Sequence, residues 1–164
     1  EAYSKWKMTI DSALLSDLSL LALYRREAPN TIFFRHPLVS HDLHARAMGK
    51  AILASLPDQD RQRALSAIEL KAHTPHTITD RDALEAELDA TRTRGYAVNK
   101  EEFFMGLASI GAPLMNFQNN EVIGAVSFDF PFEAESLDEI VRTYAAVLMK
   151  LANDLSDIMT ITEN

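Results

Sequence analysis

The period of the hydrophobic pattern changes along this chain, and the change limits the folds it can adopt. Three runs, 96–102, 106–115 and 121–130, alternate apolar and polar residues, and FQNN separates the last two. Alternating runs joined by short connections predict consecutive strands of an antiparallel meander.

Helical patterns surround these runs. Apolar residues recur on one stripe over 43–56, which Pro57 ends, and a second helix is predicted over 58–69. A third helix is expected from Asp80 to a C-terminal cap at Gly95. Ser136-Leu-Asp-Glu139 has the form of a capping box and predicts a long final helix through residue 158.

The start of the chain indicates two further strands. Residues 17–25 alternate, and after EAPN the run TIFFRH, residues 31–36, is predicted to be the hairpin partner. Residues 1–16 are assigned only as a lead-in. A length of 164 residues with 47% hydrophobic content fits one domain over 1–164, so we expect an α+β fold with an antiparallel sheet flanked by helices.

Charge and composition exclude several roles for this piece. Its formal charge of −8 and pI near 5.1 disfavour direct contact with nucleic acid. The most apolar stretch, 13–23, is interrupted by Ser16, Asp17 and Ser19, so no membrane span is expected. The chain lacks cysteine and begins with Glu, from which we expect a cytoplasmic piece of a longer protein.

The stretch HARAMGKAILASLP, residues 44–57, places a Gly-Lys pair at the start of a predicted helix. A phosphate-binding loop is excluded because the pair is followed by Ala51 and has His44 where the first glycine of that motif belongs. Two interpretations stay open. Gly49 allows close packing while Lys50 is solvated, or the glycine lets a small ligand approach the amides at the helix start.

Four phrases in order along the chain are informative together: HARAMGKAILASLP, HTPHTITDRDALEAELDATRTRGYAVNKEE, GLASIGAPLM and EVIGAVSFDFP. From about Leu38 to Ile158 the chain resembles the effector-binding domain of the IclR family of bacterial transcription regulators. The resemblance implies a GAF-like or profilin-like fold, a small-molecule pocket, assembly as homodimers or homotetramers, and a preceding winged helix-turn-helix domain. DNA binding is then expected only through that domain, which is absent from this sequence.

The resemblance also implies which residues bind the effector. Ala47, Met48 and Gly49 form one wall, and the facing strands supply Asn99, Leu107, Ser109, Ser127 and Asp129. Ser127 and Asp129 are two residues apart, so they share one strand face while Phe128 and Phe130 point to the other. No metal and no cofactor are expected.

Asp129 departs from the family pattern. Many relatives have a small hydroxyl residue at this position, whereas an ionised aspartate only accepts hydrogen bonds and repels anions. Considered alone, Asp129 therefore predicts a neutral, hydroxyl-bearing or cationic effector rather than a carboxylate.

The predicted function is an effector-sensing domain without enzymatic turnover, which couples a bound metabolite to an attached DNA-binding domain. A hydrolase or lyase with Asp129 as general base and a nearby histidine is one alternative. A GAF-like interaction module without a ligand is another, and a closed apolar cavity would favour it. We interpret SHDLH, residues 40–44, and the histidines at 36, 41, 44, 73 and 76 as local structure rather than as a triad or a metal site.

Overall fold

The computed structural model describes residues 8–29, 37–132 and 136–161. Its centre is a six-stranded sheet in the order β3-β2-β1-β6-β5-β4, in which all neighbouring strands are antiparallel. The strands are β1 (Thr9–Ser16), β2 (Ser19–Arg26), β3 (Val39–Ser40), β4 (Ala97–Lys100), β5 (Leu107–Asn116) and β6 (Glu121–Pro131). The helices are the short 3-10 helix η2 (Leu43–Ala45), α1 (Ala47–Ser55), α2 (Asp58–Ala67), α3 (Arg81–Arg94) and α4 (Leu137–Ile161).

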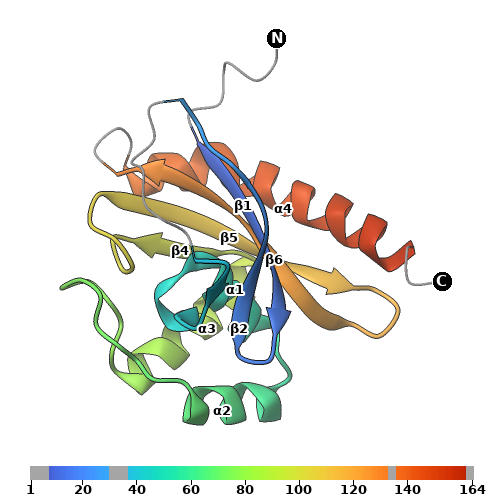
Figure 1. The fold of residues 1–164 in the computed structure, drawn as a ribbon, viewed down its shortest axis with the longest axis horizontal. Helices are drawn as coiled ribbons and strands as arrows, with labels where there is room; N and C mark the ends of the chain where they lie inside the picture. Colours follow the sequence, from blue (N-terminus) through green and yellow to red (C-terminus); the bar gives the residue numbers. More distant parts are fainter. Residues whose placement is uncertain (1–7, 30–36, 133–135, 162–164) are drawn as a thin grey trace.

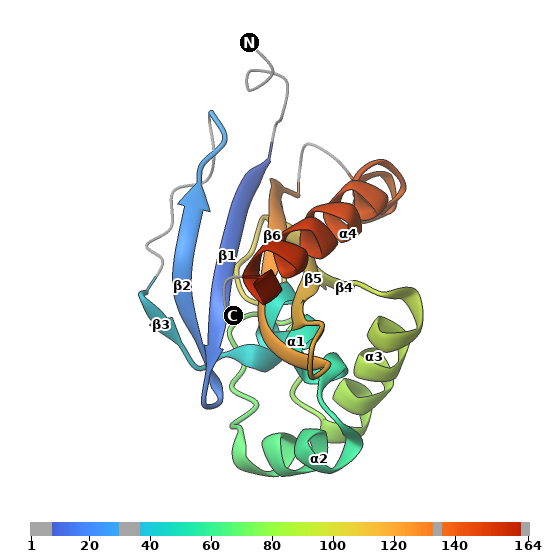
Figure 2. The ribbon, with the colours of Figure 1, turned by 90° about the vertical axis from the view of Figure 1, so that its right-hand side faces the viewer.

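The helices cover opposite faces of the sheet (Figures 1 and 2). Helix α4 packs on β5 and β6 from one side, and α1 packs on the same two strands from the other, with α2 and α3 beyond it. Each side has its own apolar core. Leu53 and Leu84 belong to the α1 core, and Ile110 and Leu148 belong to the α4 core. The predicted α+β architecture and the meander of the last three strands are confirmed.

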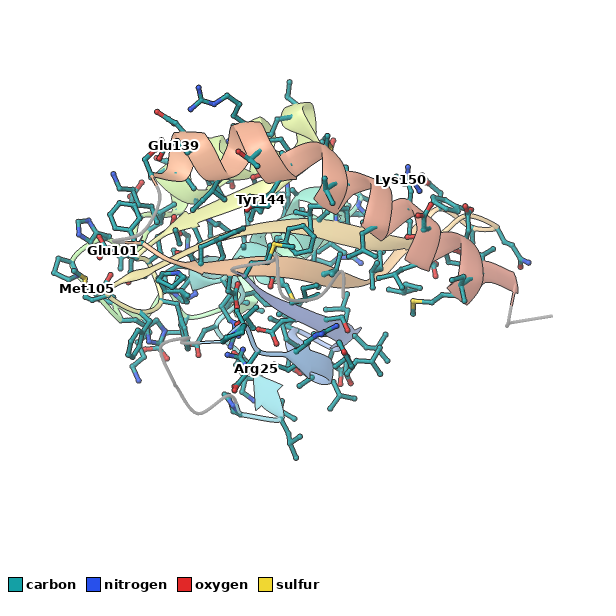
Figure 3. The ribbon with its side chains drawn as sticks, turned by 90° about the horizontal axis from the view of Figure 1, so that it is seen from above. Arg25, Glu101, Met105, Glu139, Tyr144 and Lys150 are labelled. Carbon is teal, nitrogen blue, oxygen red and sulfur yellow. The ribbon has the colours of Figure 1, made fainter. Side chains whose placement is uncertain are left out.

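Alternation along β6 divides its side chains between the two cores. Phe128 and Phe130 are buried under α4, and the ring of Phe130 lies 4.9 Å from that of Tyr144. Figure 3 shows Tyr144 pointing from α4 toward the sheet. Ser127 and Asp129 face the α1 side, where they border a cavity with Ala47 and Met48. The predicted division of these four residues is confirmed.

The opening hairpin differs from the prediction. Strand β2 pairs with β1, and Asp17 at φ 46° starts the tight turn between them. Residues 9–16, assigned only as a lead-in, therefore form a strand inside the sheet, where β1 also pairs with β6. TIFFRH lies outside the described residues, and the other edge of β2 pairs with the two residues of β3.

The helix predicted over 43–56 is divided. Arg46 has extended backbone angles, φ −119° and ψ 141°, and separates η2 from α1. Helix α1 is buried on almost every side, which explains why its sequence is apolar well beyond one stripe.

The other helix ends follow the sequence signals. Asp80 accepts a hydrogen bond from the Ala83 amide at 2.8 Å, and Gly95 ends α3 with φ 87°. Ser136 and Glu139 form the predicted capping box, in which each side chain bonds the other residue's amide. None of the helices in the described part of the chain has the length and apolarity that a membrane crossing requires.

Candidate functional site

Two rows of mostly polar residues cross the α1 face of the sheet. Strand register sets them, because residues paired across neighbouring strands point to the same face. One row contains Asn99 of β4, Ser109 of β5, Asp129 of β6 and Thr9 of β1. The next contains Gly111 of β5, Ser127 of β6, Asp11 of β1 and Arg25 of β2. The antiparallel register thus gathers side chains that are far apart in sequence.

The start of α1 lies directly over these rows because Gly111 leaves room for it. A Cβ at Gly111 would lie 2.7 Å from the carbonyl carbon of Ala47 and 2.8 Å from its oxygen. Any larger residue would push the helix away from the sheet. The missing side chain therefore brings Ala47 and Met48 against the polar rows.

A small cavity of about 10 Å³ lies between the start of α1 and the sheet, which is room for about one water molecule. Its lining residues are Arg46, Ala47, Met48, Asn99, Phe103, Leu107, Ser109, Ser127 and Asp129. Seven of the eight residues expected to bind an effector thus surround one cavity, and Gly49 is the exception. The cavity is polar, which does not favour the interaction module without a ligand.

Gly49 has a packing role. A Cβ at this position would lie 2.2 Å from the carbonyl oxygen of Leu43, which no side chain can tolerate without a backbone shift. The glycine lets η2 fold back onto the first turn of α1. Of the two interpretations left open by the sequence, this geometry supports close packing for Gly49.

Lys50 is not solvated, contrary to the packing interpretation. Its side chain is fully buried, and Nζ donates to both carboxylate oxygens of Glu102, at 2.9 and 2.8 Å. Glu87 lies 3.8 Å from the same nitrogen. Burial raises the pKa of Glu102, while the charge of Lys50 opposes that rise.

Hydrogen bonds fix the wall formed by β4 and the loop that follows it. The Asn99 amide donates to the carbonyl of Ala45 at 2.6 Å, and its oxygen accepts from the Glu102 amide at 2.9 Å. The hydroxyls of Thr74 and Thr77 donate to the carbonyls of Glu101 and Glu102, each at 2.6 Å. The HTPHT loop thereby holds the backbone at Glu102, whose carboxylate pairs with Lys50.

Three charged residues at this site, Asp11, Arg25 and Arg46, were not predicted. Arg25 Nη1 donates to Asp11 Oδ2 at 2.6 Å, and Figure 3 shows Arg25 on the strands away from α4. The pKa of Asp11 is raised to about 8, first by burial, then by the charge of Asp129 and a hydrogen bond to it; Arg25 and Arg46 oppose the rise. The alternation in TIDSALLS, residues 9–16, was the available signal for Asp11.

Arg46 directly precedes α1 and borders the cavity on that side. It is only 8% exposed, and its guanidinium lies 4.8 Å from the centre of the Phe103 ring. Burial lowers the pKa of Arg46, and the charge of Asp129 is the strongest of those that oppose this, ahead of Asp11 and Asp42. A guanidinium and a carboxylate therefore face the same cavity, whereas the sequence interpretation considered Asp129 alone.

A second hollow of about 40 Å³ lies beyond Arg46 and Met48, which border both spaces. Asp11, Arg25 and Ser40 are among its lining residues. Ser40 is 5% exposed, and its hydroxyl has no hydrogen-bond partner within the described residues. The side chains of Arg46 and Met48 thus separate two small polar spaces.

A larger hollow, about 310 Å³, lies on the opposite side of the sheet between the first strands and α4. Its lining is mainly apolar and includes Met8, Ile10, Phe128, Val147 and Leu151. Small-molecule sites combine an apolar wall with a few convergent polar groups. Such groups converge in the smaller cavity, so we take that cavity as the candidate site.

Two of the described histidines make structural contacts near α1. His73 Nε2 lies 2.9 Å from Asp42, and His44 Nε2 lies 2.9 Å from the carbonyl of Lys71. In the ranges that the structure describes, no histidine borders the cavity of Asp129, so nothing there favours the hydrolase. No group of three or more His, Asp or Glu side chains in those ranges could hold a metal ion.

Known proteins resemble the chain over most of its length. Residues 4–157 match the family model described as bacterial transcriptional regulator IclR, C-terminal. The chain is 36% identical over 99 residues to the probable transcriptional regulator SauR of Cupriavidus necator, covering 60% of this chain and 39% of that protein. It is 39% identical over 111 residues to the probable HTH-type transcriptional regulator ArcR of Halobacterium salinarum, covering 68% and 42%.

A solved structure resembles the fold closely. The crystal structure of Thermotoga maritima IclR aligns with a TM-score of 0.89 and 29% identity over 96% of this chain and 64% of that one. The chain thus spans about two fifths of the length of the two curated relatives.

Proposed function

The chain belongs to the IclR family of bacterial transcriptional regulators and corresponds to their C-terminal domain, and from that premise we propose that it senses a small-molecule effector between α1 and the sheet. The observation that carries the proposal is the convergence of Ser109, Ser127, Asp129 and Arg46 on one buried cavity at the start of α1. Buried polar side chains are costly, and their concentration at one space is typical of a recognition site.

The sensing acts through a shift in conformation. An effector that binds one arrangement of α1 and the sheet better than another favours that arrangement by its differential affinity. Gly49 and Gly111 couple α1 tightly to η2 and to β5, so a displacement at the cavity moves the helix as a unit. No chemical turnover is part of this proposal.

The partners belong to the proposal as well. The net charge of −8 supports DNA contact through another domain of the regulator rather than through this one. Exposed apolar side chains at Leu21, Leu23 and Val39, on β2 and β3, offer a surface for assembly into a homodimer or homotetramer. A cytoplasmic location fits both the DNA contact of the regulator and the assembly with further copies of this chain.

A thermal-shift screen of the chain against a metabolite panel tests the function. A ligand at a hundredfold excess over its Kd stabilises the folded state by about 2.7 kcal/mol. Asp129→Asn, in the candidate cavity, should abolish the shift, whereas Val147→Ala, in the apolar hollow on the other face, should preserve it. A panel without any hit, or a hit sensitive only to Val147→Ala, would contradict the proposal.

A further inference from the structure

Arg46 and Asp129 carry opposite charges and border the same cavity. Both are more than nine-tenths buried. They reach the cavity from different elements, since Arg46 precedes α1 and Asp129 lies on β6. A ligand that enters between α1 and the sheet therefore meets a cation on one wall and an anion on the other.

The neighbouring charges are already matched. Arg25 donates to Asp11 at 2.6 Å and to Glu27 at 3.1 Å. At neutral pH Asp11 retains its proton, because burial and the charge of Asp129 raise its pKa to about 8. Arg25 and Glu27 then balance each other, and Asp42 contacts His73 at 2.9 Å. Arg46 and Asp129 remain as the opposite charges that border the cavity.

We propose, on the premise of the effector-sensing function, that the effector is a small zwitterion whose carboxylate binds Arg46 and whose ammonium group binds Asp129. Ligand charges then replace the charges that Arg46 and Asp129 supply to each other. Arg46 and Asp129 therefore each keep an opposite charge nearby when the ligand is bound.

Ligands with a single charge lack this match. When a simple carboxylate binds Arg46, Asp129 loses its nearby positive charge. When a simple amine binds Asp129, Arg46 loses its nearby negative charge. An uncompensated buried charge is strongly destabilising. The site therefore selects against single charges as well as for the zwitterion, and discrimination by a repulsive element is a common source of specificity.

The two hollows indicate how room is made. Each is too small for a metabolite, at about 10 and 40 Å³, and Arg46 and Met48 border both. When the Arg46 side chain moves to bind the carboxylate of the ligand, the two hollows join into one chamber. The hydroxyl of Ser40, unpartnered among the described residues, then becomes available to the ligand.

Calorimetric titration of the chain with matched compounds tests the inference. The zwitterions are glycine, β-alanine and γ-aminobutyrate, which span three separations of charge. Acetate, propionate and butyrate lack the ammonium group, and methylamine, ethylamine and propylamine lack the carboxylate. We expect at least one zwitterion to bind tenfold or more tightly than both of its analogues. Equal affinity for an analogue, or no binding of any zwitterion, overturns the inference.

Two variants should change the preference in opposite directions. Asp129→Ser should turn the tenfold preference for the zwitterion into equal or tighter binding of the carboxylate, and Arg46→Gln should do the same for the amine. Asp138→Ser and Arg142→Gln, exposed on α4 beyond the opposite face of the sheet, remove the same charges and should leave the preference unchanged. Retention of the preference in both cavity variants overturns the inference.

Failure of this inference differs from failure of the proposed function. A sugar or simple carboxylate that binds the cavity while every zwitterion fails would overturn only the charge argument. A metabolite panel without any hit would overturn both.

Discussion

Asp11 of β1 and Asp129 of β6 are hydrogen-bonded carboxyl groups on the α1 face of the sheet. Their strands are neighbours, but the residues are 118 positions apart in sequence. Two buried carboxyl groups in contact cannot both ionise cheaply, so one of them retains a proton. This shared proton links the stability of the domain to pH through the candidate site.

The first prediction is that the Asp11 pair makes the domain less stable as pH rises. The pKa of Asp11 is raised from 3.8 to about 8, so between these values the folded state holds a proton that the unfolded state has lost. The contribution is fully present below pH 4 and is lost as pH rises through about 8. Denaturant melts at pH 5, 7 and 9 should record a loss of free energy of unfolding on the order of 4 kcal/mol from pH 5 to pH 9, in excess of that in Asp11→Asn.

The Asn variant isolates this effect because it keeps a donor for Asp129 and an acceptor for Arg25 but cannot ionise. Subtracting its melts removes the contributions of the histidines and exposed acids. Parallel pH profiles for the two proteins would refute the shared proton.

The second prediction concerns the buried pair of Lys50 and Glu102. Lys50→Met leaves the Glu102 carboxylate buried beside Glu87 without its cation, and the free energy of unfolding should fall by about 3–5 kcal/mol. The double variant Lys50→Met/Glu102→Leu removes both charges and should recover most of the loss. Additive losses in the double-mutant cycle would mean that the two side chains act independently.

The third prediction concerns Gly49. Alanine normally stabilises a helix relative to glycine by about 1 kcal/mol, yet Gly49→Ala should destabilise the domain by about 1–3 kcal/mol because the new Cβ meets the Leu43 backbone. Thr93→Ala on the exposed face of α3 serves as the comparison and should follow helix propensity instead. A stabilised variant would disprove the packing role.

Local patterns predicted much of this fold because strand and helix periods depend on neighbouring residues. Alternation correctly divided Ser127 and Asp129 from Phe128 and Phe130, and the caps at Asp80, Gly95 and Ser136 were visible as residue types. Failures arose where distant segments decide the outcome. Strand β1 depends on pairing with β6, more than a hundred residues later, and TIDSALLS alone carries only a short alternation.

The candidate site shows the same limit. The family resemblance named the wall and strand residues of the site. The position of Arg46 depends on the break between η2 and α1, which the continuous apolar pattern over 43–56 did not predict. Lys50 appeared solvated because its partner, Glu102, lies 52 residues away. Charges that compensate each other across a fold cannot be paired from composition, so the ligand preference inferred from Asp129 alone was incomplete.

Amide chemical-shift mapping of the chain with a metabolite selected in the thermal-shift screen tests the central claim most directly. The account predicts that the largest changes occur at Met48, Ser109 and Ser127, which surround the polar cavity under α1. Changes concentrated instead at Met8, Val147 and Leu151 would place the ligand in the apolar hollow beneath α4 and would contradict the account.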